Sequence, residues 1–322
     1  MYNVLVTGVG AIIGYGIVKS LKKSKYELNI IGTDIYEDAI GQQWCDGFEQ
    51  AVLASSPNYC EHLKRIIEKH NIDLVIPGIE QDVEKIAKNM DYFSALHTKF
   101  VINNKELLIT ANDKWSTDLI LKHHGVPSIP SYIDGEYQSV MSEIGMPFLL
   151  KPRRSYASKG IMTIHSEDEY EFWKKKLKDN FMVQKIVGDS DSEYTVGVFV
   201  FNNDESHKIV MQRKLSGEGS TAKAKIVHNK ELEAFIDRLI PIFNPIGPTN
   251  FQFRYENGVY YLLEINPRIS SSTSLRTAFG YNEAEMCIEY YLENKSPTEP
   301  KIRYGTAIRY IEDWIEYDCD HL

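Results

Sequence analysis

The sequence is poor in cysteine and lacks the spacings that cysteine-dependent proteins use. Its four cysteines, Cys45, Cys60, Cys287 and Cys319, are spread over 322 residues and form no CxxC pair. A disulfide framework is therefore not expected, and neither is a cysteine-based metal site. This composition is typical of a reducing compartment, and we predict a cytoplasmic protein.

Long apolar runs and an excess of positive charge are also missing. No apolar stretch approaches the length of a membrane span, and the chain starts with the strand-like MYNVLVTG rather than a charged-then-apolar leader. The net charge is −9 and the pI is about 5.6, which argues against wholesale binding of nucleic acid. We therefore expect neither a membrane nor a nucleic acid as partner.

The order of the apolar segments predicts the fold class. Residues 2–102 alternate short apolar runs with helical patterns, which indicates a parallel, doubly wound sheet. A smaller α+β section follows, and from Glu193 onward strand patterns dominate. We predict an α/β and α+β chain of three parts, at residues 1–110, 111–187 and 188–322.

The most informative stretch is residues 250–268, NFQFRYENGVYYLLEINPR, which predicts a β-hairpin around the turn signal Asn257-Gly258. A two-residue loop would set Phe251 opposite Glu264 and mix the two faces. A three-residue loop starting at Glu256 pairs Phe251 with Leu263 and gives one wholly apolar face. Because a buried face fixes register, we predict the three-residue loop.

The opposite face of this hairpin carries side chains with oxygen donors. Asn250, Gln252, Glu264 and Asn266 converge there, and Arg268 follows directly. Oxygen donors of this kind suit Mg²⁺ that is shared with substrate phosphates. The alternative is an amphipathic hairpin whose polar face is only solvated. A single glutamate among the aliphatic residues of LLEINPR favours the metal interpretation.

A basic loop, Lys151–Gly160, lies between two predicted strands. Its four cations and small residues could bind phosphates through guanidinium groups and backbone N–H groups. The alternative is a solvated hairpin tip. Lys151 ends the apolar strand FLL, so its position is more constrained than the rest of the loop.

Two further patterns are weak when taken alone. Gln184, Lys185 and Ile186 lie on a strand whose backbone could bind an adenine edge, and Glu193 could accept hydrogen bonds from ribose hydroxyls. The run from Gly8 to Gly14, with Asp34 at the end of the next strand, is similar to a dinucleotide fingerprint. Its third glycine comes one position late, and the glycines could serve only close helix–sheet packing.

Taken in order along the chain, these residues resemble the ATP-grasp superfamily, and most closely the ATP-binding units of the carbamoyl-phosphate synthetase large subunit. The resemblance covers nearly the whole chain as a single short copy. It implies a Rossmann-like pre-ATP-grasp domain followed by a two-lobed ATP-grasp fold.

The resemblance also implies roles for individual residues. Gln252, Glu264 and Asn266 would bind Mg²⁺, which Mn²⁺ could replace, and Arg268 would be catalytic. Contacts to ATP would come from Lys114, Lys151, Arg153, Ser158, Gly160, Gln184, Lys185, Ile186 and Glu193. Our candidates for acceptor binding are Arg213, Ser271, Ser272 and Arg276, for which a serine-rich connection is the alternative interpretation.

The predicted function is an ATP- and Mg²⁺-dependent ligase that activates a carboxylate as an acyl phosphate for attack by an amine or a similar nucleophile. Its partners would be small-molecule acids and amines, and the resemblance suggests a homodimer. One alternative is an NAD(P)-dependent oxidoreductase that uses the front glycine loop and Asp34. The other is a regulatory subunit that binds ATP without catalysis.

Overall fold

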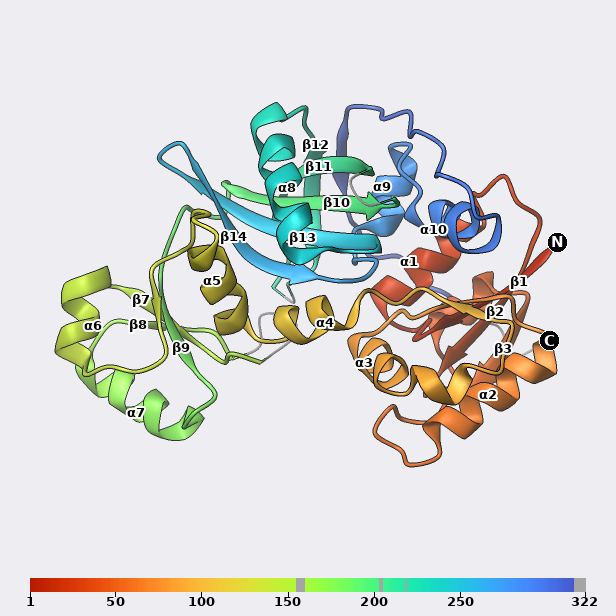
Figure 1. Cartoon of the computed structure of the whole chain (residues 1–322), viewed down its shortest axis with the longest axis horizontal. Coiled ribbons are helices and arrows are strands. Elements are labelled where there is room, and N and C mark those ends of the chain that lie inside the picture. Colours follow the sequence, from red (N-terminus) through yellow and green to blue (C-terminus); the bar gives the residue numbers. More distant parts are fainter. Residues whose placement is uncertain (155–159, 203–204, 218, 316–322) are drawn as a thin grey trace.

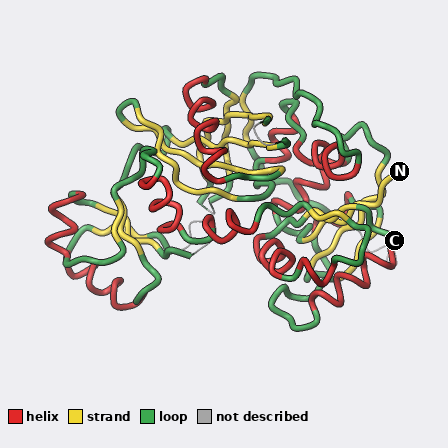
Figure 2. Tube along the Cα trace, in the orientation of Figure 1, coloured by secondary structure: helices red, strands yellow, loops and turns green. Residues whose placement is uncertain are grey.

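The computed structural model describes residues 1–154, 160–202, 205–217 and 219–315. Three sheets follow one another along the long axis of the molecule, and helices and loops connect them (Figures 1 and 2). One sheet falls within each of the ranges 1–110, 111–187 and 188–322, and we keep these ranges as a proposed division.

The first sheet is parallel and has the strand order β3-β2-β1-β4-β5, which confirms the predicted doubly wound arrangement. The order reverses between β1 and β4, so the loops after these two strands meet at one edge. Its strands are β1 (Tyr2–Thr7), β2 (Leu28–Asp34), β3 (Gly47–Gln50), β4 (Leu74–Ile76) and β5 (Lys99–Phe100). Its helices are α1 (Ile12–Leu21), η1 (Ile40–Trp44), α2 (Tyr59–His70), α3 (Glu80–Lys88) and η2 (Met90–Phe93).

The second part is a small antiparallel sheet with the order β6-β9-β7-β8. Helix α5 (Lys114–His123) leads into it, and the Asp113 side chain caps this helix by accepting a hydrogen bond from the Trp115 amide. The other elements are α4 (Lys105–Ala111), β6 (Ser131–Tyr132), α6 (Tyr137–Ile144), β7 (Phe148–Lys151), β8 (Met162–Ile164), α7 (Glu167–Leu177) and β9 (Met182–Lys185).

The third part is an antiparallel sheet with the order β14-β13-β10-β11-β12-β15. Its strands are β10 (Glu193–Val200), β11 (Ser206–Leu215), β12 (Thr221–Ile226), β13 (Gly247–Glu256), β14 (Val259–Asn266) and β15 (Thr306–Ile308). Its helices are α8 (Lys230–Phe243), α9 (Thr273–Ala278), α10 (Glu283–Cys287) and the π-helical turn η3 (Ile288–Leu292). Across the described ranges, no helix combines the length and the apolar character that spanning a membrane requires.

The register of the β13–β14 hairpin differs from the prediction. The turn has two residues, Asn257 and Gly258, both at positive φ, and Glu256 pairs with Val259. A β-bulge then leaves Leu263 unpaired, because Phe253 pairs with Leu262 while Gln252 pairs with Glu264. The predicted three-residue loop is therefore wrong. Because of the bulge, the apolar and the polar side chains still lie on opposite faces, which a regular two-residue hairpin would not allow.

The apolar face of the hairpin packs against α8. Phe251 and Phe253 are fully buried beside Phe235 and Leu239 of that helix. The opposite face carries Asn250 across from Asn266, and Gln252 across from Glu264. Burial of the aromatic side thus holds these four polar side chains on the other face of the sheet.

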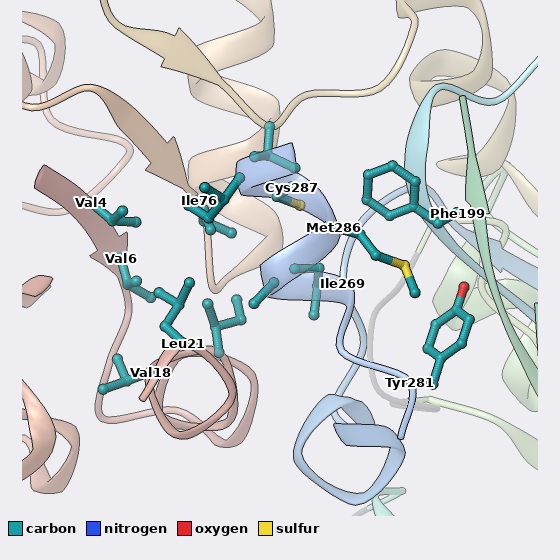
Figure 3. Packing of buried hydrophobic residues seen from close by; sticks show 14 of the residues in the cluster. Val4, Val6, Val18, Leu21, Ile76, Phe199, Ile269, Tyr281, Met286 and Cys287 are labelled. Carbon is teal, nitrogen blue, oxygen red and sulfur yellow. The ribbon is translucent and has the colours of Figure 1, made fainter. Parts of the chain in front are cut away.

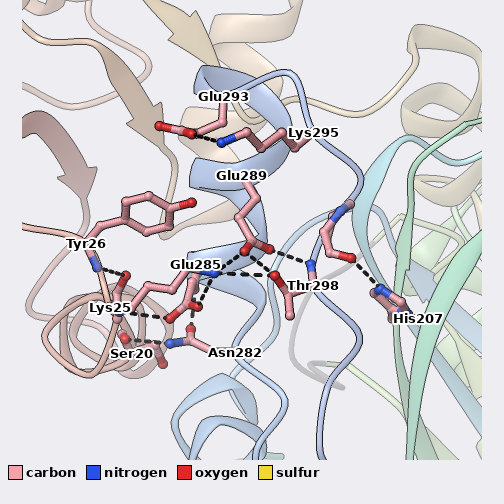
Figure 4. A network of polar contacts seen from close by, with 12 residues as sticks. Ser20, Lys25, Tyr26, His207, Asn282, Glu285, Glu289, Glu293, Lys295 and Thr298 are labelled. Atoms are coloured by element: carbon pink, nitrogen blue, oxygen red, sulfur yellow. Dashed lines mark hydrogen bonds and ion pairs between the residues drawn. The ribbon is translucent and has the colours of Figure 1, made fainter.

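The first and third parts share one hydrophobic core. Figure 3 shows Val6 and Leu21 of the N-terminal part beside Ile269 and Met286 of the third. Polar contacts reinforce the junction in Figure 4, where Lys25 pairs with Glu289 and Asn282 donates to the Ser20 carbonyl. The parallel sheet therefore holds a fixed position against the six-stranded sheet.

Candidate active site

A cavity of about 370 Å³ lies between the small sheet and the six-stranded sheet. We call it the interlobe cavity. The small-sheet part contributes Lys114, Lys151 and the segment Gln184–Val187, and the larger sheet contributes Glu193, Gln252, Arg254 and Glu264. Most of the residues predicted to bind ATP and metal therefore line one space.

A second cavity, of about 200 Å³, adjoins the first and shares Leu215, Gln252 and Glu264 with it. We call it the serine cavity because Ser220, Ser270 and Ser271 line it. Ile12 and Ile13 at the start of α1 close one side, so the N-terminal part contributes to this site. The other lining residues are Arg213, Gly219, Asn250, Asn266 and Arg268.

Lys151 is the buried cation of the interlobe cavity, and 5% of its surface is exposed. Its Nζ donates to Gln184 Oε1 at 2.6 Å, and Gln184 Nε2 donates to Ser131 Oγ at 2.9 Å. Burial, together with the nearby charge of Lys114, lowers the pKa of Lys151 to about 8. A polyanion in this cavity would raise this pKa again, because it favours the charged form of the lysine.

Arg153 does not line either cavity. Its guanidinium binds the Asp113 carboxylate through Nε at 3.1 Å and Nη2 at 2.5 Å, while its carbonyl accepts from the Lys114 amide. Burial opposes ionisation of Asp113, but the hydrogen bond and charge of Arg153 outweigh it and lower the pKa of that carboxyl. In this structure Arg153 therefore fixes the loop after Lys151 to the start of α5.

Two more residues of this loop, Ser158 and Gly160, were predicted to contact ATP. Ser158 lies outside the described residues, and Gly160 is exposed at a φ of +78°. Ile161 and Thr163, just beyond them, line the cavity.

The predicted hinge segment passes along the cavity, with Lys185, Ile186 and Val187 in its lining. The Lys185 amide donates to the Pro130 carbonyl, so this donor serves the small sheet. Gln184 enters the site mainly as the partner of Lys151.

Glu193, the predicted ribose ligand, is buried in an ion-pair network. Arg213 donates to its Oε1 at 2.9 Å, and Arg254 Nη2 lies 3.4 Å from its Oε2. Burial lowers the pKa of Arg213 and the charge of Glu193 partly offsets this. Arg213, which we predicted to bind acceptor, thus also positions Glu193, and sequence reasoning missed Arg254.

The predicted metal ligands lie together but differ in their present partners. Gln252 Oε1 accepts from Arg213 at 2.8 Å, and Asn266 Oδ1 accepts from Arg268 at 3.1 Å. Glu264 faces both cavities. Within the described ranges, no group of three or more His, Cys, Asp or Glu side chains could hold a metal ion. One carboxylate with amide oxygens fits Mg²⁺ when phosphate oxygens and water complete the shell.

Arg268 has a partner from a distant part of the chain. Its Nε donates to Glu80 Oε2 at 2.5 Å, and both side chains are largely buried. Glu80 begins α3, directly after the loop that follows β4. Sequence reasoning missed Glu80, although a carboxylate just past the carboxyl end of a buried parallel strand is a signal that could have identified it.

The residues proposed for acceptor binding divide into two groups. Ser271 lines the serine cavity, whereas Ser272 is fully buried beneath it, within 3.0 Å of Thr221 Oγ1. Arg276 is also fully buried, pairs with Glu283 at 2.8 Å and donates to Asn250. A Cβ on Gly197 would lie 2.7 Å from its guanidinium carbon, so this glycine leaves room for it. Arg276 supports the floor of the site and does not reach the cavity.

Comparisons with known proteins identify the domains and proteins to which this chain is similar. A family model described as ATP-grasp in the biosynthetic pathway with Ter operon matches residues 178–314, and a PylC-like N-terminal domain model matches residues 4–101. The formate-dependent phosphoribosylglycinamide formyltransferase of Bacteroides thetaiotaomicron is 25% identical over 95% of this chain and 81% of its own length. The carbamoyl phosphate synthase large chain of Methanothermobacter thermautotrophicus is 26% identical over 70% of this chain and 24% of its own length.

Among solved structures, N5-carboxyaminoimidazole synthetase from Staphylococcus aureus, complexed with ADP, has the same fold. It aligns with a TM-score of 0.76 and 17% identity over 96% of this chain and 82% of that protein. Residues 178–314 thus match an ATP-grasp family and residues 4–101 match a PylC-like N-terminal domain, and the chain as a whole has the fold of N5-carboxyaminoimidazole synthetase.

Proposed function

We propose that this protein is an ADP-forming carboxylate–amine ligase that uses ATP and Mg²⁺. One observation carries the proposal: two cavities of different chemistry meet at Glu264. The interlobe cavity offers buried and semi-buried cations for a triphosphate, and the serine cavity offers Arg268 and hydroxyl groups for a small acid.

In the first step, an oxygen of the substrate carboxylate attacks the γ-phosphorus of ATP. A bond forms between that oxygen and phosphorus, the bond to the β–γ bridging oxygen breaks, and ADP leaves. Lys151 and Lys114 hold the phosphates from the interlobe side, and Arg268 stabilises the charge on the transferring group from the serine-cavity side. Positioning and electrostatics supply most of the rate enhancement in such a reaction.

In the second step, a neutral amine attacks the acyl carbon of the acyl phosphate. The new carbon–nitrogen bond forms, the carbon–oxygen bond to phosphate breaks, and phosphate leaves with the proton that the nitrogen loses. The apolar residues Ile12 and Ile13 at the edge of the serine cavity limit the access of water to this intermediate.

Gln252, Glu264 and Asn266 would hold Mg²⁺ or Mn²⁺ against the ATP phosphates. The ion would neutralise charge on the β- and γ-phosphates when bound. Arg213 and Arg268 donate to the amide oxygens of Gln252 and Asn266, so both oxygens would have to be shared with the ion or released to it.

Neither alternative function has comparable support. A bound dinucleotide would need free amides in the front glycine loop, and the amides of Val9, Gly10 and Ala11 already donate to groups within the protein. A regulatory subunit that only binds ATP has no reason to maintain Arg268 and Glu80 as a pair beside Glu264. The predicted cytoplasmic location and the homodimer stay predictions.

The decisive experiment measures ADP release by Glu264→Ala with a panel of small carboxylic acids and amines. We expect Mg²⁺-dependent ADP formation to fall by about 100-fold or more, because metal ions supply several kcal/mol of transition-state stabilisation. Unchanged turnover would disprove the role of Glu264.

Glu299→Ala is the matched control, since Glu299 is exposed and far along the chain from both cavities. A thermal unfolding curve for each variant shows whether the fold is intact. If no acid–amine pair releases ADP with the wild-type protein, the ligase proposal itself fails.

A further inference from the structure

A cavity larger than the interlobe cavity or the serine cavity lies outside the candidate active site. It has a volume of about 650 Å³ and is formed by the loops that follow β1, β2, β3 and β4. We call it the N-terminal cavity. It lies at the carboxyl ends of parallel strands, where the strand order reverses, and open α/β sheets bind ligands at such positions.

The front glycine loop does not offer this cavity a phosphate site. The Gly10 amide donates to Asp34 Oδ2 at 2.8 Å, and the Ala11 amide donates to the Gly8 carbonyl at 3.0 Å. The Val9 amide donates to the Thr33 carbonyl at 3.1 Å. Because successive amides of the loop have partners within the protein, a pyrophosphate would find few donors here.

The charge of the cavity is negative. Asp34, Asp38 and Asp82 line it, and the described lining residues include no lysine, arginine or histidine. Burial raises the pKa of the Asp82 carboxyl, although this group accepts hydrogen bonds from Thr7 and Tyr59, whereas Asp38 is exposed at the edge. A phosphate or carboxylate would be repelled here, and a cation would be attracted.

The walls of the cavity are mainly apolar and partly open to solvent. Tyr36 and Leu53 expose 65% and 58% of their surface, and Val52, Ile79 and Ile40 complete the apolar lining. Exposed apolar side chains gathered around a cavity are typical of a ligand site.

The N-terminal cavity and the serine cavity are separated by two loops only. In the first loop, Gly10 and Ala11 line the N-terminal cavity, while Ile12 and Ile13 line the serine cavity. Where the second loop enters α3, Ile79 and Gln81 line the N-terminal cavity, and Glu80 between them binds Arg268 of the serine cavity. A ligand held by these loops is therefore next to the proposed ligation centre.

We propose that the N-terminal cavity binds an organic amine with an apolar body and that this amine belongs to the acceptor substrate. The apolar body packs against Leu53 and Ile79, and a protonated amino group lies among Asp34, Asp38 and Asp82. A second, neutral nitrogen of the same molecule would be the nucleophile. This inference rests on the proposed ligase function for its role, whereas the binding itself does not depend on that function.

The test uses hexylamine and hexanoate, which share an apolar chain and differ in the sign of their charge. Isothermal titration calorimetry of the full chain without nucleotide measures binding of each probe. We expect hexylamine to bind in the millimolar range and hexanoate not to bind. Failure of hexylamine to bind, or equal binding of both probes, overturns the proposal.

Leu53→Trp fills the mouth of the cavity and should weaken hexylamine binding by about tenfold or more. Asp38→Asn removes one exposed charge and should weaken it about two- to threefold. Ile109→Trp is the matched control, because Ile109 is an exposed isoleucine that lines none of the three cavities. Hexylamine binding that survives in Leu53→Trp overturns the assignment of the site.

A thermal shift with Mg²⁺ and ATP separates this inference from the ligase proposal. Leu53→Trp should keep the wild-type shift, which shows that the fold and the interlobe cavity are intact. Loss of amine binding with an unchanged ATP response supports the N-terminal cavity as an amine site. If the amine binds as expected but no acid releases ADP, the ligase function fails and the binding site stands.

Discussion

The interlobe cavity and the N-terminal cavity each lie beside a glycine-containing loop, but their charges are opposite. Lys114 and Lys151 line the first, and Asp34, Asp38 and Asp82 line the second. In the first, a buried lysine faces the space. In the second, the amides of the glycine loop donate to Asp34 and to the loop itself. The comparison shows that a glycine pattern predicts the shape of a loop, whereas its hydrogen-bond partners decide whether it binds an anion.

The largest effect on ATP binding is expected from removing the positive charge of Lys151. Lys151→Met keeps the length of the side chain and removes its charge, so ATP should bind about 10- to 100-fold more weakly. Lys175→Met is the control, since Lys175 is exposed on α7 and does not line the interlobe cavity. Fluorescence titration with a labelled ATP analogue measures both affinities. Equal affinities for the two variants would show that the interlobe cavity is not the phosphate site.

The next effect is a pH dependence of ATP binding. Burial lowers the pKa of Lys151 to about 8, so above pH 8 the unbound protein has to take up a proton on this side chain when ATP binds. The affinity should fall by up to about tenfold between pH 8 and pH 9, which corresponds to about 1.4 kcal/mol. Calorimetry in buffers of different ionisation enthalpy should detect the proton uptake, and Lys151→Met should abolish it.

The lowered pKa of Lys151 also predicts how the free energy of unfolding depends on pH. Its pKa is lower in the folded protein than the ordinary value of 10.5, so the unfolded chain binds more protons between pH 8 and pH 10.5. The contribution of Lys151 to the free energy of unfolding should therefore rise with pH in this window. Urea titrations of wild type and Lys151→Met at pH 8 and pH 10 test the sign, and a falling difference would contradict it.

A smaller effect, on kcat, is expected from Glu80, which lies between the N-terminal cavity and the serine cavity. Glu80→Gln weakens the ion pair that orients Arg268 and should lower kcat about three- to tenfold while leaving the affinity for ATP unchanged. Glu84→Gln on the same helix is the control. Steady-state kinetics of ADP release separate kcat from KM, and a change in KM for ATP alone would show that Glu80 acts on the nucleotide instead.

The smallest effect should come from the glycine loop. A Cβ on Gly10 would lie 3.0 Å from Asp34 Oδ2, so Gly10→Ala requires a small local shift. We expect the affinity for ATP to change less than about twofold, because this loop does not line the interlobe cavity. Wild type should show no thermal shift with NAD(H) at millimolar concentration. A thermal shift with NAD(H) that Gly10→Ala removes would show that the glycine loop binds a dinucleotide.

Part of the site could be predicted because its signals are local. The alternation along residues 250–266 identified one apolar and one polar face, and the end of an apolar strand identified Lys151. The register of the hairpin could not be predicted, because the bulge at Leu263 depends on the packing of Phe251 and Phe253 against α8. Local alternation does not contain that information.

By itself, the sequence determined the fold class, the order of the site residues and the polar face that carries Glu264. The tertiary structure alone decided which cations meet the cavities. Arg276 is sealed in the core by Glu283 and Asn250, Arg153 binds Asp113, and Arg268 meets Glu80 from 188 residues earlier in the chain. The physical reason is that a pattern along the chain fixes which face a side chain occupies. Its partner across the fold is fixed only when distant strands and helices pack together.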